Sequence, residues 1–122
     1  MERIRVLLAN HPMMIPDALR QMITDQDDME LVGDVRGQMK ILQETGRTKA
    51  DAVVLLQEGN EEPALCSQLL AVYPDLTILA VSSDMTRVFI QQLCSHRKKV
   101  ATGEHLDILG TMRMAVKQPC GE

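Results

Sequence analysis

The five residues Ala52–Leu56, AVVLL, are the most apolar and β-branched stretch of the 122-residue chain. A short, continuous run of this kind is typical of a strand buried on both faces, as at the centre of a parallel sheet. Similar segments occur on both sides of it in the sequence. They are Arg3–Ala9 (RIRVLLA), Met29–Val35 (MELVGDV), Thr77–Ser82 (TILAVS) and, with the weakest pattern, Lys98–Thr102 (KKVAT). The sequence therefore predicts five strands, with Ala52–Leu56 in the middle.

Segments with helical spacing of apolar residues alternate with these strands. Pro16 and Pro63 suit the first turns of two helices, and Gly46 has the position at which a left-handed residue ends another. Ser83 or Asp84 is placed to cap a helix after the fourth strand. The apolar positions of the five predicted helices are, in order, Ile15, Leu19, Met22 and Ile23; those within Gln38–Thr45; Leu65, Leu69 and Val72; Met85, Phe89 and Leu93; and Ile108, Leu109, Met112 and Val116.

Five successive strand–helix units predict an α/β fold. Short strands that alternate with helices favour right-handed crossovers, and these give a five-stranded parallel sheet with helices on both faces. A length of 122 residues suits about one domain, and no linker, internal repeat or low-complexity tract interrupts the chain. We therefore expect residues 1–122 to form a single domain.

Composition and charge argue against several classes of function. A net charge of −4 disfavours a general nucleic-acid or membrane binder, because such proteins usually present a basic face. No apolar run approaches the ~18–20 residues that span a bilayer, and the N-terminus lacks the pattern of a signal peptide, so we expect a cytoplasmic protein. The cysteines Cys66, Cys94 and Cys120 are odd in number and lack C-x-x-C spacing, which favours reduced thiols over a disulfide framework or a zinc site.

The order of these segments resembles the receiver domain of bacterial response regulators, especially the subfamily with a C-terminal helix-turn-helix. The resemblance covers about Arg3–Val116 and rests on four segments: VLLANHPMMIPDALRQMI from Val6, MELVGDVRG from Met29, ADAVVLL from Ala50 and YPDLTILAVSS from Tyr73. It implies a flavodoxin-like strand order, with the functional site at the carboxyl ends of the strands.

The resemblance also implies which residues occupy the phosphorylation site. In a receiver that transfers phosphate, an acidic pair after the first strand and an Asp ending the third strand bind Mg²⁺, and that Asp attacks the phosphodonor. A Ser or Thr ending the fourth strand contacts the phosphoryl oxygens. In this chain Asn10 and His11 stand in place of the acidic pair. Leu56 takes the place of the attacking Asp, or Gln57 does if the strand is shifted by one residue, and Ser82 matches the hydroxyl position.

Most groups needed for phosphoryl transfer are therefore missing. Ala101 stands where the family has a lysine at the end of the fifth strand. Leucine has no lone pair to attack phosphorus or bind a metal, and Mg²⁺ prefers carboxylate oxygens to the side chains of Asn10 and His11. The glutamates within Glu58–Glu62 fit a solvated loop better than an ion site. We predict no metal site, no cofactor and no enzymatic activity, and we expect Ser82 to satisfy polar groups at a strand end.

The resulting hypothesis is a pseudo-receiver that signals by binding a protein partner or by forming a homodimer, independently of aspartyl phosphate. The resemblance implies contact through the face formed by the fourth helix, fifth strand and fifth helix. The candidate contact residues on this face are Met85, Arg87, Phe89, Arg97, Lys98, Met112 and Met114.

Two alternatives stay open. The first is the N-terminal receiver of a transcription regulator, which would contact nucleic acid only through a DNA-binding domain outside this sequence. The second is a small-molecule sensor, whose cleft would bind a ligand in place of phosphate through Asn10, His11, Gln57 and Ser82. An enzyme of another flavodoxin-like class is disfavoured, because the sequence contains neither a nucleophile–base pair nor a glycine-rich phosphate loop.

Overall fold

The computed structural model of the protein describes residues 3–59, 63–92, 98–102 and 108–117, and for residues 98–102 and 117 it describes the backbone alone. Among these residues, every helix is too short or too polar to cross a lipid bilayer. The elements are the strands β1 (Ile4–Asn10), β2 (Met29–Arg36), β3 (Ala52–Gln57), β4 (Thr77–Ser82), β5 (Arg87–Gln92) and β6 (Lys98–Thr102), and the helices α1 (Asp17–Thr24), α2 (Gln38–Arg47), α3 (Ala64–Val72) and α4 (Ile108–Lys117).

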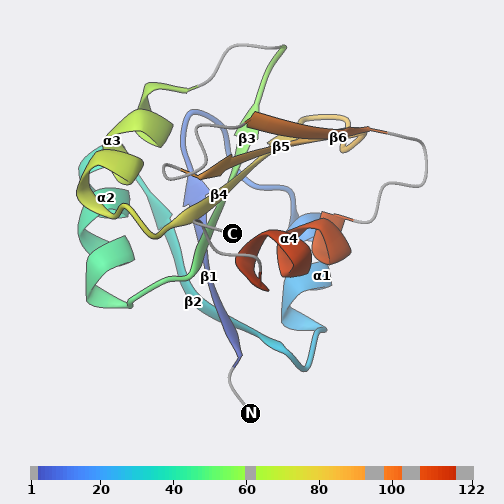
Figure 1. The fold of residues 1–122 in the computed structure, drawn as a ribbon, viewed down its shortest axis with the longest axis horizontal. Coiled ribbons are helices and arrows are strands. Elements are labelled where there is room, and N and C mark those ends of the chain that lie inside the picture. The colour runs from blue at the N-terminus through green and yellow to red at the C-terminus, as the bar shows by residue number, and fades with distance from the viewer. Residues whose placement is uncertain (1–2, 60–62, 93–97, 103–107, 118–122) are drawn as a thin grey trace.

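The described strands form one sheet with the order β2-β1-β3-β4-β5-β6, between two helical layers (Figure 1). The strands β2, β1, β3 and β4 are parallel to their neighbours. All residues of β3 are buried, which confirms its predicted place at the centre of the sheet. Helices α1 and α4 cover one face, and α2 and α3 cover the other. The predicted α/β class, with helices on both faces, is confirmed.

The segment after β4 differs from its prediction. Instead of a helix through Met85 and Phe89, the chain makes a hairpin in which β5 runs antiparallel to β4, and β6 runs antiparallel to β5. The prediction of five parallel strands is therefore wrong at this edge. Val88 and Ile90 pack on the side of α1 and α4, whereas Phe89 packs on the side of α3. Successive side chains of this segment point to opposite faces of the sheet, and both faces are buried, which favours a strand. Leu93, the third apolar position of the predicted helix, lies outside the described residues.

Prolines precede two helices, as predicted from the preference of proline for a first turn. Pro16 is the N-cap of α1 and Pro63 is the N-cap of α3. On α3, Leu65 and Leu69 pack against the sheet, but Val72 is exposed and does not share their buried face. The helix is therefore anchored by its first two turns.

Gly46 has a different role from the predicted one. It lies within α2 rather than beyond its end, and the left-handed residue that follows the helix is Lys49, with φ of 54°. A Cβ atom at Gly46 would lie 2.4 Å from the hydroxyl oxygen of Tyr73. That hydroxyl donates a hydrogen bond to the carbonyl oxygen of Leu42 at 2.6 Å. A glycine is needed here because the tyrosine ring passes close to the helix backbone.

Helix α4 is tied to the loop between α1 and β2. The Arg113 guanidinium donates from Nε to a carboxylate oxygen of Asp28 at 2.6 Å and from a terminal nitrogen to Gln26 Oε1 at 2.5 Å. Ile108, Leu109 and Met112 of the same helix are buried with residues of α1 in one apolar cluster. The buried residues of this cluster are Ile4, Val6, Leu8, Ile15, Leu19, Ile23, Met29, Ala52, Val54, Leu56, Leu79, Val81, Val88, Ile90, Ile108, Leu109 and Met112. The C-terminal helix thus completes the core on the α1 side of the sheet.

Candidate functional site

The carboxyl ends of the parallel strands bring most of the predicted site residues to one edge of the sheet. Strand β1 ends at Asn10, β3 ends at Gln57, and β4 ends at Ser82. Gln57 and Ser82 are direct neighbours in the register of β3 and β4. All three side chains are buried, and the half-buried His11 follows β1 directly. The structure therefore gathers these residues as sequence reasoning placed them.

Asn10 is held by hydrogen bonds that fix the loop after β1. Its side-chain oxygen accepts from the backbone N–H of Ile15 at 2.8 Å. Its amide nitrogen donates to Asp34 Oδ1 at 2.7 Å and to the carbonyl oxygen of Val35 at 3.0 Å. Because Asn10 is buried and its oxygen already accepts a bond, its role here is to join the start of α1 to strand β2.

Asp34 belongs to the same network and is an ion-pair partner of helix α1. Arg20 Nε donates to Asp34 Oδ2 at 2.5 Å, and the Arg20 guanidinium also contacts Asp17. Burial acts to raise the pKa of Asp34, but the hydrogen bonds from Arg20 and Asn10 outweigh it and lower the pKa below its usual value. The carboxylate therefore stays ionised at neutral pH and holds α1 against the outer strand.

Leu56 is a core residue. It is 4% exposed and belongs to the apolar cluster that α1 and α4 form with the sheet. Gln57, the residue at the alternative register, is also buried, and its amide nitrogen makes a long contact of 3.4 Å to the carbonyl oxygen of Gly59. In either register, the position that the resemblance assigns to an attacking carboxylate holds an uncharged and buried side chain.

Ser82 organises the turn between β4 and β5. Its hydroxyl donates to Asp84 Oδ1 at 2.7 Å and accepts from the backbone N–H groups of Thr86 at 3.1 Å and Arg87 at 2.9 Å. Hydrogen bonds from Thr86, and then from Ser82, lower the pKa of Asp84 to about 2. The hydroxyl therefore satisfies polar groups at the end of a strand.

The substitution Ser82→Ala tests this role. It removes the partner of two backbone N–H groups, so we expect the free energy of unfolding to fall by about 1–2 kcal/mol. We also expect the pKa of Asp84 to rise toward its usual value, because one of its donors is lost. Because the pKa of Asp84 is lowered in the folded state, its ionised carboxylate stabilises the fold at pH values above its unfolded pKa. This stabilisation disappears as the pH falls toward about 2. Carboxyl NMR titration and urea unfolding measure both effects.

The exposed neighbour Ser83 provides the matched control. Ser83→Ala is expected to leave both the stability and the titration of Asp84 unchanged. An unchanged Asp84 titration in Ser82→Ala would contradict the assigned hydrogen-bond network.

The predicted contact residues of the β4–β5 hairpin are largely turned inward. Met85 is half-buried against the cluster on the α1 side, and its φ of 61° places it in the left-handed region of the turn. Phe89 is buried, and the Arg87 guanidinium lies 5.7 Å from the centre of its ring. The Phe89 side chain thus serves the core, with Arg87 beside it.

The remaining predicted contact residues lie on α4 and β6. Met112 is fully buried in the core and offers no surface to a partner. Met114 is 64% exposed on the outer side of α4. Arg97 lies outside the described residues, and only the backbone of Lys98 is described, in β6.

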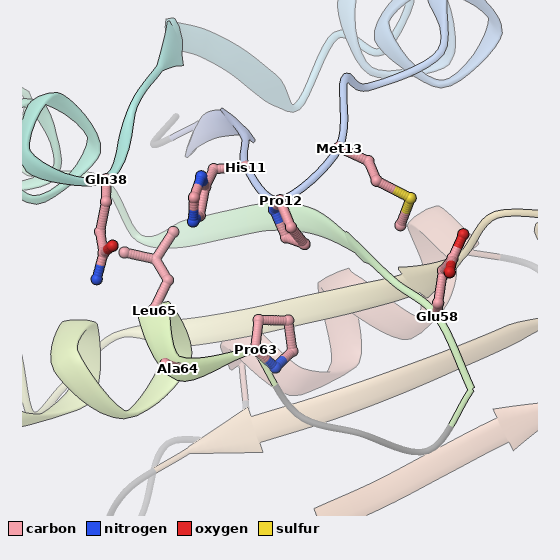
Figure 2. Close-up of a pocket in the computed structure, with 8 residues that line it drawn as sticks. All are labelled: His11, Pro12, Met13, Gln38, Glu58, Pro63, Ala64 and Leu65. Carbon is pink, nitrogen blue, oxygen red and sulfur yellow. The ribbon is translucent and has the colours of Figure 1, made fainter.

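A pocket of about 480 Å³ opens beside the strand ends, where the loop after β1 faces the start of α3 (Figure 2). Its lining residues are His11, Pro12, Met13, Gln38, Glu58, Pro63, Ala64 and Leu65. Of the four residues predicted to line a ligand-binding cleft, only His11 lines this pocket. In the sheet, β2 lies on one side of β1, and β3 lies on the other side of β1. The pocket is therefore at the point where the strand order reverses.

Sequence reasoning missed most of the pocket because its walls come from four separate segments. Two local signals pointed to this edge. Gly37, with φ of 90°, directly precedes α2, and Pro63 directly precedes α3. Both residues mark loops that follow the carboxyl ends of strands, but neither residue predicts which side chains face one another across the pocket.

Other candidate groups are not assembled in the described part of the chain. There, no group of three or more His, Cys, Asp or Glu residues is arranged to hold a metal ion. His96 and His105, the other two histidines of the chain, lie outside the described residues. Comparison with models of protein families, with curated proteins and with solved structures gave no match.

Proposed function

We propose that this chain is a receiver-like signalling domain that does not transfer phosphate and acts by binding a protein partner. The observation that carries the proposal is the burial of Leu56 in the apolar core, at the position where the resemblance calls for an attacking carboxylate. A leucine at this position can neither form an acyl phosphate nor bind Mg²⁺.

The strand order supports a flavodoxin-like, receiver-like architecture. The parallel strands β2, β1, β3 and β4 occur in the order that the resemblance implies, and helices cover both faces. The departure comes after β4, where a hairpin takes the place of a helix and a crossover. Fold by itself does not specify function, so the proposal depends on the site.

The internal use of the remaining polar side chains supports the loss of phosphoryl transfer. The Asn10 amide links the first loop to β2, and the Ser82 hydroxyl holds the β4–β5 turn. If either side chain turned to bind a phosphate, the backbone N–H groups that now donate to it would lose their hydrogen-bond partner. Each is instead part of what keeps the strand ends in place.

The proposed partner surface is the side of the molecule formed by α4, β5 and β6. Strand β6 is the last strand in the sheet order, and among the described residues no strand pairs with its outer edge. The unpaired backbone groups of an edge strand are a common docking site for an extended segment of a partner or of a second copy. Met114 adds an exposed apolar side chain on the neighbouring helix.

Separate experiments test the two parts of the proposal. Incubation with Mg²⁺ and acetyl phosphate is expected to add no phosphoryl mass, and beryllofluoride is expected to leave the melting temperature unchanged. In a pull-down from a cytosolic extract, Met114→Glu is expected to lose proteins that the parent chain retains, because it places a charge in the proposed apolar contact.

Met39→Glu is the matched control, because Met39 is 68% exposed and lies on α2, on the opposite face of the sheet. A stable phosphorylated species would overturn the first part of the proposal. Equal losses of bound proteins in both variants, or no loss in either, would overturn the assigned partner surface.

A further inference from the structure

The pocket at the reversal of strand order has the position and size of a small-molecule site. In open α/β sheets, ligands bind in the crevice outside the carboxyl ends of the strands at this point. Its volume of about 480 Å³ lies within the range common for such sites. This inference goes beyond the proposed function, because it requires no protein partner.

The walls of the pocket are apolar and stiff. Pro12, from the loop after β1, and Pro63, at the start of α3, lie on facing sides, and Leu65 extends the wall next to Pro63 (Figure 2). Leu65 is itself packed in the core beneath α3, so this wall is fixed from behind. Stiff apolar walls lose little conformational freedom on binding, and they favour a compact apolar body.

The polar groups lie at two ends of this apolar slot. His11 and Gln38 are at one end, and Glu58 is at the other, next to Met13 (Figure 2). The Gln38 amide nitrogen donates one of its two N–H groups to the side-chain oxygen of Gln68, which leaves the other N–H and the side-chain oxygen for a ligand. A carboxylate accepts hydrogen bonds only, and a neutral imidazole accepts at one nitrogen. Both ends therefore provide hydrogen-bond acceptors.

We propose that the pocket binds a small primary amine with a flat apolar body and a second hydrogen-bond donor at its far end. The ammonium group pairs with the Glu58 carboxylate, the body lies between Pro12 and Pro63, and the second donor meets His11 and Gln38. An anion of the same shape is disfavoured, because its charge would face a carboxylate.

The probes for the test are tyramine and 3-(4-hydroxyphenyl)propanoate, which share a ring and a phenol hydroxyl and differ in the charged end. In ¹H–¹⁵N NMR titrations, tyramine is expected to shift the backbone amides of His11, Met13, Ala64 and Leu65. The carboxylate probe is expected to bind up to about fivefold more weakly, because a solvent-exposed ion pair is worth up to roughly this factor. Equal binding of both probes, or no shifts at these amides, would overturn the proposal.

Three variants assign the preference to its residues. Glu58→Gln is expected to remove the preference for tyramine, whereas Glu30→Gln, at an exposed carboxylate on β2, is expected to keep it. Ala64→Phe, at an exposed position that lines the pocket, is expected to fill the slot and abolish the binding of both probes. A preference that persists in Glu58→Gln, or binding that persists in Ala64→Phe, would place the ligand elsewhere.

Discussion

Replacing Leu56 by aspartate is expected to lower the free energy of unfolding by more than about 4 kcal/mol, although the same residue type would complete a phosphorylation site in a receiver. The side chain is 4% exposed and is surrounded by apolar residues from α1, α4 and the sheet. A carboxylate there loses its hydration without gaining a partner. Urea denaturation at pH 7, followed by circular dichroism, measures the loss.

Leu56→Met is the control for packing at this position. A hydrophobic exchange that nearly conserves volume is expected to cost less than about 1.5 kcal/mol. An aspartate variant with nearly parental stability and a measurable affinity for Mg²⁺ would show that this position faces an accessible ion site, and the assignment of Leu56 to the core would then fail.

Replacing Asn10 by aspartate is expected to cost about 3–5 kcal/mol at pH 7. The change removes the two N–H donors that bind Asp34 and the carbonyl oxygen of Val35, and it places a second carboxylate beside that of Asp34. As with Leu56, the substitution introduces the residue type that receiver domains have at the matching position, but it conflicts with the network that surrounds this position in this chain.

The pH dependence of this variant has a definite sign. Burial and the neighbouring Asp34 raise the pKa of the new carboxyl in the folded state above its unfolded value of about 4. A raised pKa gives stability that is complete below the unfolded value and is lost as the pH rises through the folded value. The deficit relative to the parent chain is therefore expected to be larger at pH 7 than at pH 5. The ion pair between Asp34 and Arg20 is kept in the variant, so the new carboxyl, rather than Asp34, is expected to take up the proton.

Asn10→Ala separates charge from lost hydrogen bonds. It removes these two bonds and also the bond from the backbone N–H of Ile15, but it adds no ionisable group, so its deficit is expected to be equal at pH 5 and pH 7. If the aspartate variant also shows no difference between the two pH values, its new carboxylate is solvated, and the buried position assigned to Asn10 is wrong.

The parallel part of the sheet was predictable because local pattern and burial agree there. AVVLL and TILAVS are short apolar runs between turn residues, and both are strands buried on two faces. The hairpin after β4 was not predicted, because Met85, Phe89 and Leu93 also fit helical spacing and the resemblance favours a helix. The stronger signal was the run of Val88, Phe89 and Ile90, whose aromatic and β-branched side chains favour a strand.

The candidate site was predictable only in part. The sequence locates Asn10, Leu56 and Ser82 at the ends of strands, since each follows or completes an apolar run. It does not show that Asn10 meets Asp34, which is 24 residues away. It also does not show that Pro12 and Pro63 face each other across a pocket. Such pairings depend on how neighbouring strands and helices pack, which local spacing does not encode.

The tie between α4 and the α1–β2 loop has a consequence for protein synthesis. The contact between Arg113 and Asp28 joins residues 85 positions apart, and α4 covers the same face of the sheet as α1. A nascent chain that has not yet emerged through α4 would leave the part of this face that α4 covers exposed to water. Because contacts between distant residues slow folding, we expect the emerging protein to stay sensitive to proteases until α4 has left the ribosome.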